Sequence, residues 1–203
     1  MKTPWYKGID KRTKQEHNAS MSHRFSDIFP LKQGRTHEVY GPCAYAFAGI
    51  AIGLSRSPAF WFVEDWVPDM VHPVGLIPYC DPHLVLIGRC PTAMDVLAAV
   101  EEALRSGVVS FVVAEVTKPL TLKAGRRLQL AADAGKATGL MIIPNGMGSN
   151  ATHTRWEVQP KFSDAHDALM QWSVVKNKSG TLASWDICWN EETHRLCVVS
   201  KAA

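Results

Sequence analysis

One short segment lies where a phosphate-binding loop would lie but lacks the residues that bind phosphate. Residues 41–48, Gly-Pro-Cys-Ala-Tyr-Ala-Phe-Ala, follow a short strand predicted over 37–40 and open a predicted helix. A phosphate loop there reads Gly-x-x-x-x-Gly-Lys-Ser/Thr, because its amides cradle phosphates, its lysine reaches them and its hydroxyl holds Mg²⁺. Ala46, Phe47 and Ala48 replace the second glycine, the lysine and the hydroxyl residue, and each lost charge-assisted contact costs about 1.5–3 kcal/mol. We therefore expect no nucleotide to bind at this degenerate loop, whose defining residues are Gly41, Pro42, Phe47 and Ala48.

The remaining reactive residue types form no convincing catalytic or metal site. Glu64 ends an apolar run and could be a catalytic base, but without a phosphate-binding lysine a vestigial or structural role is favoured. The cysteines are widely spaced, which argues against a zinc ribbon or disulfide framework and favours buried thiols. Cys80 and His83 lack a second pair of metal ligands. The sequence thus predicts no catalytic residue, no metal site and no cofactor.

The elements that position these residues follow from apolar patterning. Continuous apolar runs over 59–63, 84–87, 108–116 and 139–143 predict buried strands. Helical periodicity predicts helices over 44–54, 92–106 and 121–134, with Thr92 as an N-cap and Gly107 and Gly135 as C-terminal stops. Strands alternating with helices indicate βαβ units and a parallel sheet.

The region after Asn145 has a different pattern. Strands are predicted over 154–158, 169–176, 184–190 and 194–200, with no long helix between them. The predicted fold class is therefore α/β, a mostly parallel sheet with helices on both faces and an antiparallel C-terminal extension. We assign residues 26–203 to this single domain and residues 1–25 to a flexible basic N-terminal arm.

The net charge of +3 is unevenly distributed. Residues 1–37 carry eight Lys or Arg against three Asp or Glu, and the rest carries fourteen against sixteen. A basic arm on a near-neutral body suggests an acidic partner, either nucleic acid or an acidic protein surface, although charge alone favours a solvated tail. No run approaches the roughly 20 apolar residues of a membrane span, and no secretory signal begins the chain, so we expect a cytoplasmic protein without a membrane partner.

From Gly41 to about Cys197 the chain resembles the core of the recombinase RecA, a P-loop NTPase-type fold. Residues 59–64, Ala-Phe-Trp-Phe-Val-Glu, resemble the strand that ends in that family's catalytic Glu, which places Glu64 at this position. Residues 110–116 resemble the Walker B strand, with Ala114-Glu115 where the family has Asp-Ser. Residues 174–178, Val-Val-Lys-Asn-Lys, resemble a late strand whose lysines reach a neighbour's nucleotide. The same resemblance makes residues 28–30, Ile-Phe-Pro, a candidate contact to a neighbouring copy.

The chain is more similar to the ImuA (inducible mutagenesis protein A) family, which is itself RecA-like. The similarity lies in residues 37–41, 101–107, 125–132, 152–156, and 176–178 followed by 184–186. Gly125 departs from the family pattern, which usually has a small hydroxyl residue there, and the arm before Ser26 resembles nothing known to us. The resemblance implies a non-catalytic accessory role in SOS-induced, error-prone translesion DNA synthesis. The implied partners are a Y-family-like polymerase partner, an error-prone C-family DNA polymerase and the RecA recombinase.

Two alternatives remain open beside this interpretation. The chain could be a divergent ATPase of DNA repair that uses Glu64, or a direct DNA-binding module that uses the basic arm, Lys176 and Lys178. On the predicted helix over 121–134, one of Arg126 and Arg127 is expected to pair with Asp133 or Glu115, which leaves the other exposed. The candidate contacts to a partner or DNA are Arg126, Arg127, Arg155, Trp156, Lys176, Asn177 and Lys178.

Overall fold

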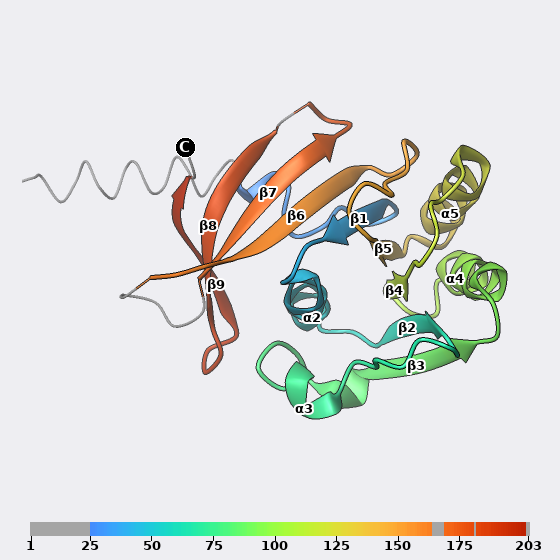
Figure 1. The fold of residues 1–203 in the computed structure, drawn as a ribbon, viewed down its shortest axis with the longest axis horizontal. Helices are drawn as coiled ribbons and strands as arrows, with labels where there is room; N and C mark the ends of the chain where they lie inside the picture. Colours follow the sequence, from blue (N-terminus) through green and yellow to red (C-terminus); the bar gives the residue numbers. More distant parts are fainter. Residues whose placement is uncertain (1–24, 164–168, 181, 202–203) are drawn as a thin grey trace, which may run out of the picture.

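The computed structural model describes residues 25–163, 169–180 and 182–201. These residues form a nine-stranded sheet in the order β3-β2-β4-β5-β1-β6-β7-β8-β9 (Figure 1). The strands are β1 (Thr36–Tyr40), β2 (Ala59–Glu64), β3 (Val85–Cys90), β4 (Phe111–Glu115), β5 (Thr138–Ile142), β6 (Thr154–Lys161), β7 (Leu169–Asn177), β8 (Ala183–Asn190) and β9 (Arg195–Lys201). The helices are α2 (Ala44–Ser55), the short α3 (Pro73–Leu76), α4 (Ala93–Ser106) and α5 (Leu122–Gly135).

The sheet changes from parallel to antiparallel at β6. Strands β3, β2, β4, β5, β1 and β6 pair in parallel, whereas β6, β7, β8 and β9 pair antiparallel. The prediction of a mostly parallel sheet with an antiparallel C-terminal extension is confirmed. It could be made because the apolar runs that precede β6 alternate with helices and those that follow do not.

Helices cover both faces of the parallel part (Figure 1). On one face α2 packs into a core that contains Phe47 and several fully buried tryptophans, and on the other α4 and α5 pack against β4 and β5. Residues 25–31 join the α2 core, with Phe25, Ile28 and Phe29 all buried. Residues 28–30 are therefore not the contact to a neighbouring copy that the resemblance suggested, because Ile28 and Phe29 face the protein's own interior. The predicted arm, apart from buried Phe25, lies outside the described residues.

The ends of α4 and α5 are set by local hydrogen bonds. Thr92 caps α4 by accepting from the Asp95 amide at 3.2 Å, and Gly107 follows the helix with a φ of 64°. Thr121 caps α5 by accepting from the Ala124 amide at 3.1 Å. The prediction that α5 ends before Gly135 was wrong by one residue. Gly135 is the last helical residue, and Lys136, which follows it, takes the left-handed conformation with a φ of 53°.

A coil segment, residues 143–153, joins β5 to β6 instead of a helix. It is anchored on the fully buried carboxylate of Glu38 in β1, which accepts from the Ser149 amide at 2.7 Å and the Thr152 hydroxyl at 3.1 Å. Arg155 completes the site, its Nε lying 2.7 Å from Glu38 Oε2. The segment also packs so closely on α5 that a Cβ at Gly125 would lie 2.6 Å from Ser149 Oγ. A larger residue at Gly125 would push the segment off the helix.

Within the described residues, no helix has the length and apolar character needed to cross a membrane.

Candidate functional site

The loop between β1 and α2 is closed by bonds to the protein itself. The Cys43 amide donates to the Val158 carbonyl at 3.3 Å, and the Ala44 amide donates to the Gly41 carbonyl at 3.1 Å. Gly41 has a φ of 105°, and a Cβ there would collide with the Val158 carbonyl oxygen. Since Pro42 has no amide hydrogen, the turn presents few of the donors that a bound phosphate needs.

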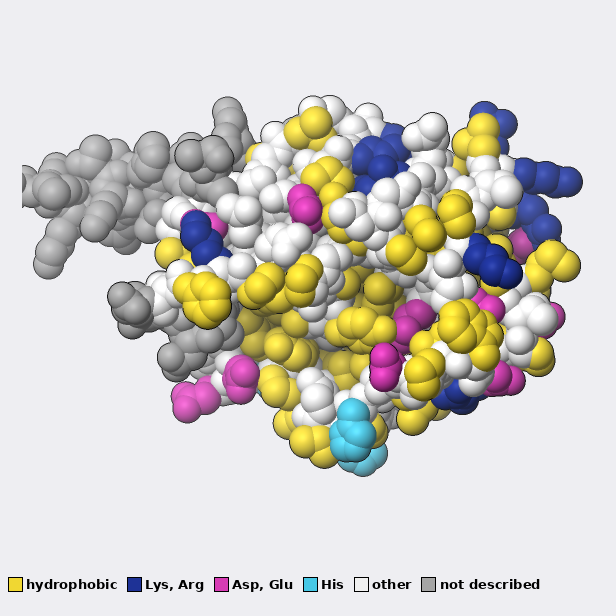
Figure 2. Space-filling model, in the orientation of Figure 1, with side chains coloured by type: hydrophobic (Ala, Val, Ile, Leu, Met, Phe, Trp, Pro, Cys, Tyr) yellow, Lys and Arg dark blue, Asp and Glu magenta, His cyan; other side chains and the backbone are white. Residues whose placement is uncertain are grey.

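The position of the phosphate-loop lysine lies inside the core. Phe47 is fully buried, and its ring centroid lies 5.6 Å from that of Phe29, 5.4 Å from Trp156 and 4.5 Å from Trp172. Ala48 is fully buried as well. Figure 2 shows a hollow lined by hydrophobic side chains over α2, with Asp and Glu side chains beside it. This surface offers apolar contacts and negative charge, neither of which suits a polyphosphate.

Glu64 and Glu115 end the neighbouring strands β2 and β4, and both carboxylates are engaged. Glu64 is buried, accepts a hydrogen bond from the Thr117 hydroxyl and accepts another from Trp66 Nε1 at 2.8 Å. The Thr117 hydrogen bond, aided by that from Trp66, outweighs burial and holds the pKa of Glu64 below its usual value. A general base for neutral pH needs a raised pKa, so this environment weakens Glu64 as a base.

Glu115 serves to hold α2 against the sheet. Its Oε1 accepts from Trp61 Nε1 and its Oε2 from the Tyr45 hydroxyl, each at 2.7 Å. Burial, with the hydrogen bond to Glu115, raises the pKa of Tyr45. The predicted pairing of Glu115 with an arginine of α5 is therefore wrong, because its carboxylate faces α2 and not α5.

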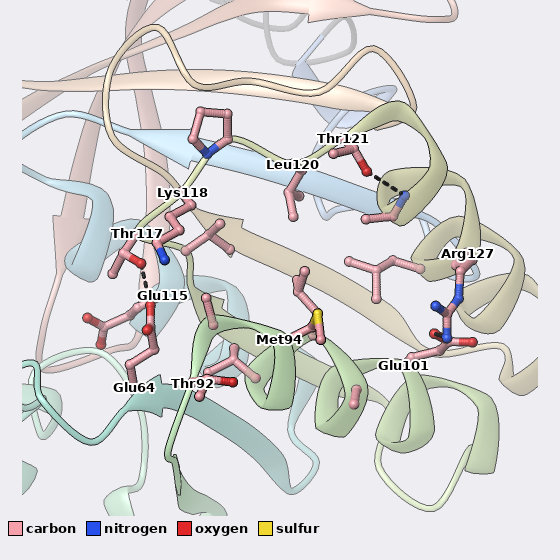
Figure 3. Close-up of a pocket in the computed structure, with 18 of the residues that line it drawn as sticks. Glu64, Thr92, Met94, Glu101, Glu115, Thr117, Lys118, Leu120, Thr121 and Arg127 are labelled. Atoms are coloured by element: carbon pink, nitrogen blue, oxygen red, sulfur yellow. Dashed lines mark hydrogen bonds and ion pairs between the residues drawn. The ribbon is translucent and has the colours of Figure 1, made fainter.

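A groove of about 780 Å³ lies between α4 and α5, and we call it the α4–α5 groove. Its floor and walls are mostly apolar, and Figure 3 shows Glu64 and Thr117 at one end and Glu101 and Arg127 at the other. Its position follows from the topology, because α4 follows the carboxyl end of β3, α5 follows that of β4, and only β2 separates these two strands. Its apolar lining includes Met94, Leu97, Ala98, Leu120, Ala124 and Leu128.

An ion-pair network closes the far end of the α4–α5 groove. The nearly buried carboxylate of Glu101 receives Arg127 Nη2 at 2.6 Å and Arg105 Nη2 at 2.5 Å. The hydrogen bond from Arg105, with that from Arg127, holds the pKa of Glu101 below its ordinary value. Arg127 thus pairs with α4 instead of Asp133, which corrects the predicted partner. Sequence periodicity places Arg127 on the helix surface but does not say which helix lies opposite.

Asp133 is engaged elsewhere, and Arg126 has no salt bridge among the described residues. Asp133 Oδ1 lies 3.1 Å from Arg35 Nη1 and 3.2 Å from Lys136 Nζ. Arg126 is exposed on α5. Both arginines are exposed, and Arg126 is the one without a carboxylate partner among the described residues.

The predicted contacts on the antiparallel part lie together but are largely engaged within the fold. Trp156 is fully buried and Arg155 pairs with Glu38, so neither presents itself as a surface anchor. Lys176 Nζ donates to the Asn150 carbonyl at 3.2 Å and to the Thr152 carbonyl.

Lys178 and Asn177 follow Lys176 at the end of β7. Lys178 Nζ donates to the Ala151 carbonyl at 2.5 Å, and Asn177 Oδ1 accepts from the Ser179 amide at 2.9 Å. The two lysines therefore fasten the coil segment 143–153 while keeping their positive charge at the surface.

Four basic side chains surround His153 at this end of β6. Burial lowers the pKa of His153, and the charges of Lys32, Arg35, Lys178 and Lys176 lower it further. We call these five residues the His153 cluster. Lys32 and Lys178 are exposed, so the cluster presents positive charge to solvent.

His37, next to this cluster, is a buried group that the sequence interpretation missed. Its Nε2 lies 3.0 Å from the Lys32 carbonyl and its Nδ1 lies 2.6 Å from Thr154 Oγ1. A carbonyl only accepts, so Nε2 carries the hydrogen and Nδ1 accepts from the Thr154 hydroxyl. Burial lowers the pKa of His37 to about 3, and the ring is neutral. The available signal was weak: His37 and Glu38 are polar residues at the start of the short strand predicted over 37–40.

In comparisons with known proteins, no family model matches the chain, and no curated protein matches it. Among the described residues, no group of three or more His, Cys, Asp or Glu side chains could hold a metal ion.

Proposed function

We propose that the protein is a non-catalytic accessory protein with a RecA-like fold that acts through protein contacts at the α4–α5 groove. The observation that carries this is the contrast between two places at the carboxyl ends of the parallel strands. The β1–α2 turn is closed by its own hydrogen bonds, whereas the groove between α4 and α5 is open and mostly apolar. The pathway, SOS-induced error-prone translesion synthesis, rests on the sequence resemblance to the ImuA family.

The strand order supports the RecA-like part of the proposal. Strand β1, which precedes the degenerate loop, lies between β5 and β6, and β4, which resembles the Walker B strand, is separated from it by β5 alone. Glu64 ends β2, the neighbour of β4 on the other side. The adjacency of Glu64 to the strand that resembles Walker B supports the proposal of a retained nucleotide-hydrolysis scaffold.

Titration calorimetry with Mg·ATP tests the non-catalytic part. We expect no saturable heat, because the loop offers neither the lysine nor the Ser/Thr hydroxyl of a phosphate loop, and its amides at Cys43 and Ala44 are engaged. Micromolar binding that is lost in Glu64→Gln would instead establish the divergent ATPase.

Pull-down from DNA-damaged cells tests the groove. Ala98→Trp places a large ring in the α4–α5 groove, so recovery of polymerase components or recombinase should fall by about tenfold or more, as for loss of an interface hot spot. Leu130→Trp is the control, since Leu130 is exposed on α5 and does not line the groove. Equal recovery by both variants would refute docking at the groove, and failure of the unaltered protein to recover either partner would refute the pathway.

A second function, direct binding of nucleic acid, is favoured by the His153 cluster. Four cations around one histidine create a positive surface that can contact phosphates, and such binding weakens steeply with salt. A mobility shift in Lys32→Gln and Lys178→Gln tests it, with Lys123→Gln on α5 as control. Affinity that is unchanged in both cluster variants would exclude this surface.

A further inference from the structure

The last two strands of the sheet bring two cysteines opposite each other. In the antiparallel β8–β9 pair Cys188 is the partner of Cys197, between the pairs Ile187–Val198 and Trp189–Leu196. Both cysteines are thiols in the structure. They are nine positions apart in the sequence, and the register alone makes them neighbours.

Their register gives the spacing that a disulfide requires. Residues directly opposite in an antiparallel pair have Cα atoms about 4.5–5.5 Å apart, and disulfides span Cα distances of about 4.4–6.8 Å. Opposite side chains also share one face of a sheet. Since Ile187 and Trp189 are buried on the α2 face, Cys188 and Cys197 lie together on the outer face.

We propose that Cys188 and Cys197 form a reversible intramolecular disulfide by exchange with a low-molecular-weight disulfide such as oxidised glutathione. This inference is independent of the proposed function. The Cys197 thiolate attacks one sulfur of oxidised glutathione, which forms a mixed disulfide and expels one glutathione thiolate. Cys188 then attacks the Cys197 sulfur, expelling the second glutathione. The two protein thiols are oxidised, the glutathione disulfide is reduced to two thiols, and the two cysteine protons end on the released glutathiones.

The exposure of Cys197 distinguishes this pair from the other cysteines. Cys197 is exposed and can meet a dissolved disulfide, whereas Cys80 and Cys90 are buried. Burial raises the pKa of Cys43 and Cys90, and raises that of Cys80 to about 11, which disfavours their reactive thiolates. We therefore expect oxidation to be selective for the β8–β9 pair.

The bond would fix the terminal strand of the sheet. Strand β9 pairs with β8 on one side, and no strand among the described residues pairs with its other side. A cross-link between β8 and β9 closes a short loop around the 191–194 turn and restrains opening of this edge. Amide hydrogen exchange in β9 should slow several-fold on oxidation.

The test uses the full chain at low micromolar concentration with excess oxidised glutathione, followed by alkylation and peptide mapping without reductant. We expect a peptide that links Cys188 to Cys197, a monomer in solution, and reversal by excess reduced glutathione. Cys188→Ser and Cys197→Ser should abolish the cross-link, whereas Cys43→Ser should leave it intact. Hydrogen exchange in β8 of each reduced variant shows whether the sheet is still formed.

Other products would overturn the proposal. A glutathione adduct on Cys197 that persists without the cross-link would show that Cys188 does not reach its sulfur. A dimer linked through Cys197 would show that the reaction is between molecules. The proposal is also overturned if slow hydrogen exchange in β8 shows that the sheet is formed and the two cysteines still do not cross-link.

Discussion

At the residue scale, the molecule is organised around polar groups buried within β1. Glu38 and His37 are both fully buried, and each has hydrogen-bond partners on β6 or the segment before it. Removing the Arg155 partner would leave Glu38 as a buried unpaired charge, which costs about 3–5 kcal/mol. Arg155, a surface candidate in the sequence interpretation, is thereby a structural residue.

His37 predicts a pH dependence of stability. The folded-state pKa is about 3, against an ordinary value of 6.5, so between these values the unfolded chain binds the extra proton. The free energy of unfolding should therefore fall as pH decreases from 6.5 toward 3, by up to about 1.4 kcal/mol per pH unit from this group.

Urea denaturation at several pH values measures the effect. His37→Gln should flatten the acid side of the profile, whereas His72→Gln, at an exposed site whose side chain makes no salt bridge among the described residues, should leave it unchanged. A profile that is equally steep in His37→Gln would show that other groups, such as Glu101, dominate the acid response.

Residue burial could be predicted in part from the sequence. Trp156, a contact candidate in the sequence interpretation, lies two positions from both Thr154 and Val158 in β6, and this period of two would have placed it with them on the buried face. The partner of Arg127 could not be predicted, because helix periodicity fixes a direction but not the element found there. The same limit hid the α4–α5 groove, which exists only where the two helices meet.

At the element scale, α4 and α5 owe their spacing to a close backbone contact. Gly135, the last residue of α5, is so near α4 that a Cβ there would collide with the Leu104 carbonyl oxygen. That carbonyl cannot rotate away, so the contact sets the separation of the helices at this end. The α4–α5 groove depends on the same separation.

Gly135→Ala should therefore destabilise the protein even though alanine favours helix. We expect a loss of about 1–3 kcal/mol, as for overpacking in a dense interior, measured by urea denaturation. Gly75→Ala is the matched control, because a Cβ at Gly75 meets no atom within 4 Å. A stability of Gly135→Ala equal to that of the unaltered protein would mean that α4 and α5 separate without cost.

The elements themselves were predictable, whereas their order in the sheet was not. Each strand and helix expected from periodicity is present, with ends shifted by a few residues. The position of β1 between β5 and β6 depends on contacts far apart in the sequence, which local patterns do not encode. Cys188 and Cys197 show the same point, since only the β8–β9 register makes them opposite.

At the scale of the whole molecule, the two ends of the sheet are unequal. Strand β3 forms the end opposite β9, and its Leu86 and Ile87 are both exposed although successive residues face opposite sides. An exposed apolar edge strand is a template for pairing with another chain. Nearby in the sequence, Val74 and Ile77 are also exposed.

We expect self-association that grows with protein concentration and depends on β3. Leu86→Lys places a charge on the edge and should lower the apparent mass measured by light scattering at high concentration. Val108→Lys is the control, because Val108 is equally apolar and more exposed but lies outside β3. If neither variant changes the apparent mass, the edge of β3 is not where copies meet.

The placement of the tryptophans has a consequence for spectroscopy. Trp61, Trp156, Trp172, Trp185 and Trp189 all belong to the core on the α2 face, and no tryptophan among the described residues belongs to the core beneath α4 and α5. Intrinsic fluorescence will therefore report mainly on one half of the molecule. The exception is the exposed Trp66, which donates to Glu64 at one end of the α4–α5 groove, so binding there should alter the emission of Trp66. Loosening of α4 and α5 will be visible mainly to circular dichroism or hydrogen exchange.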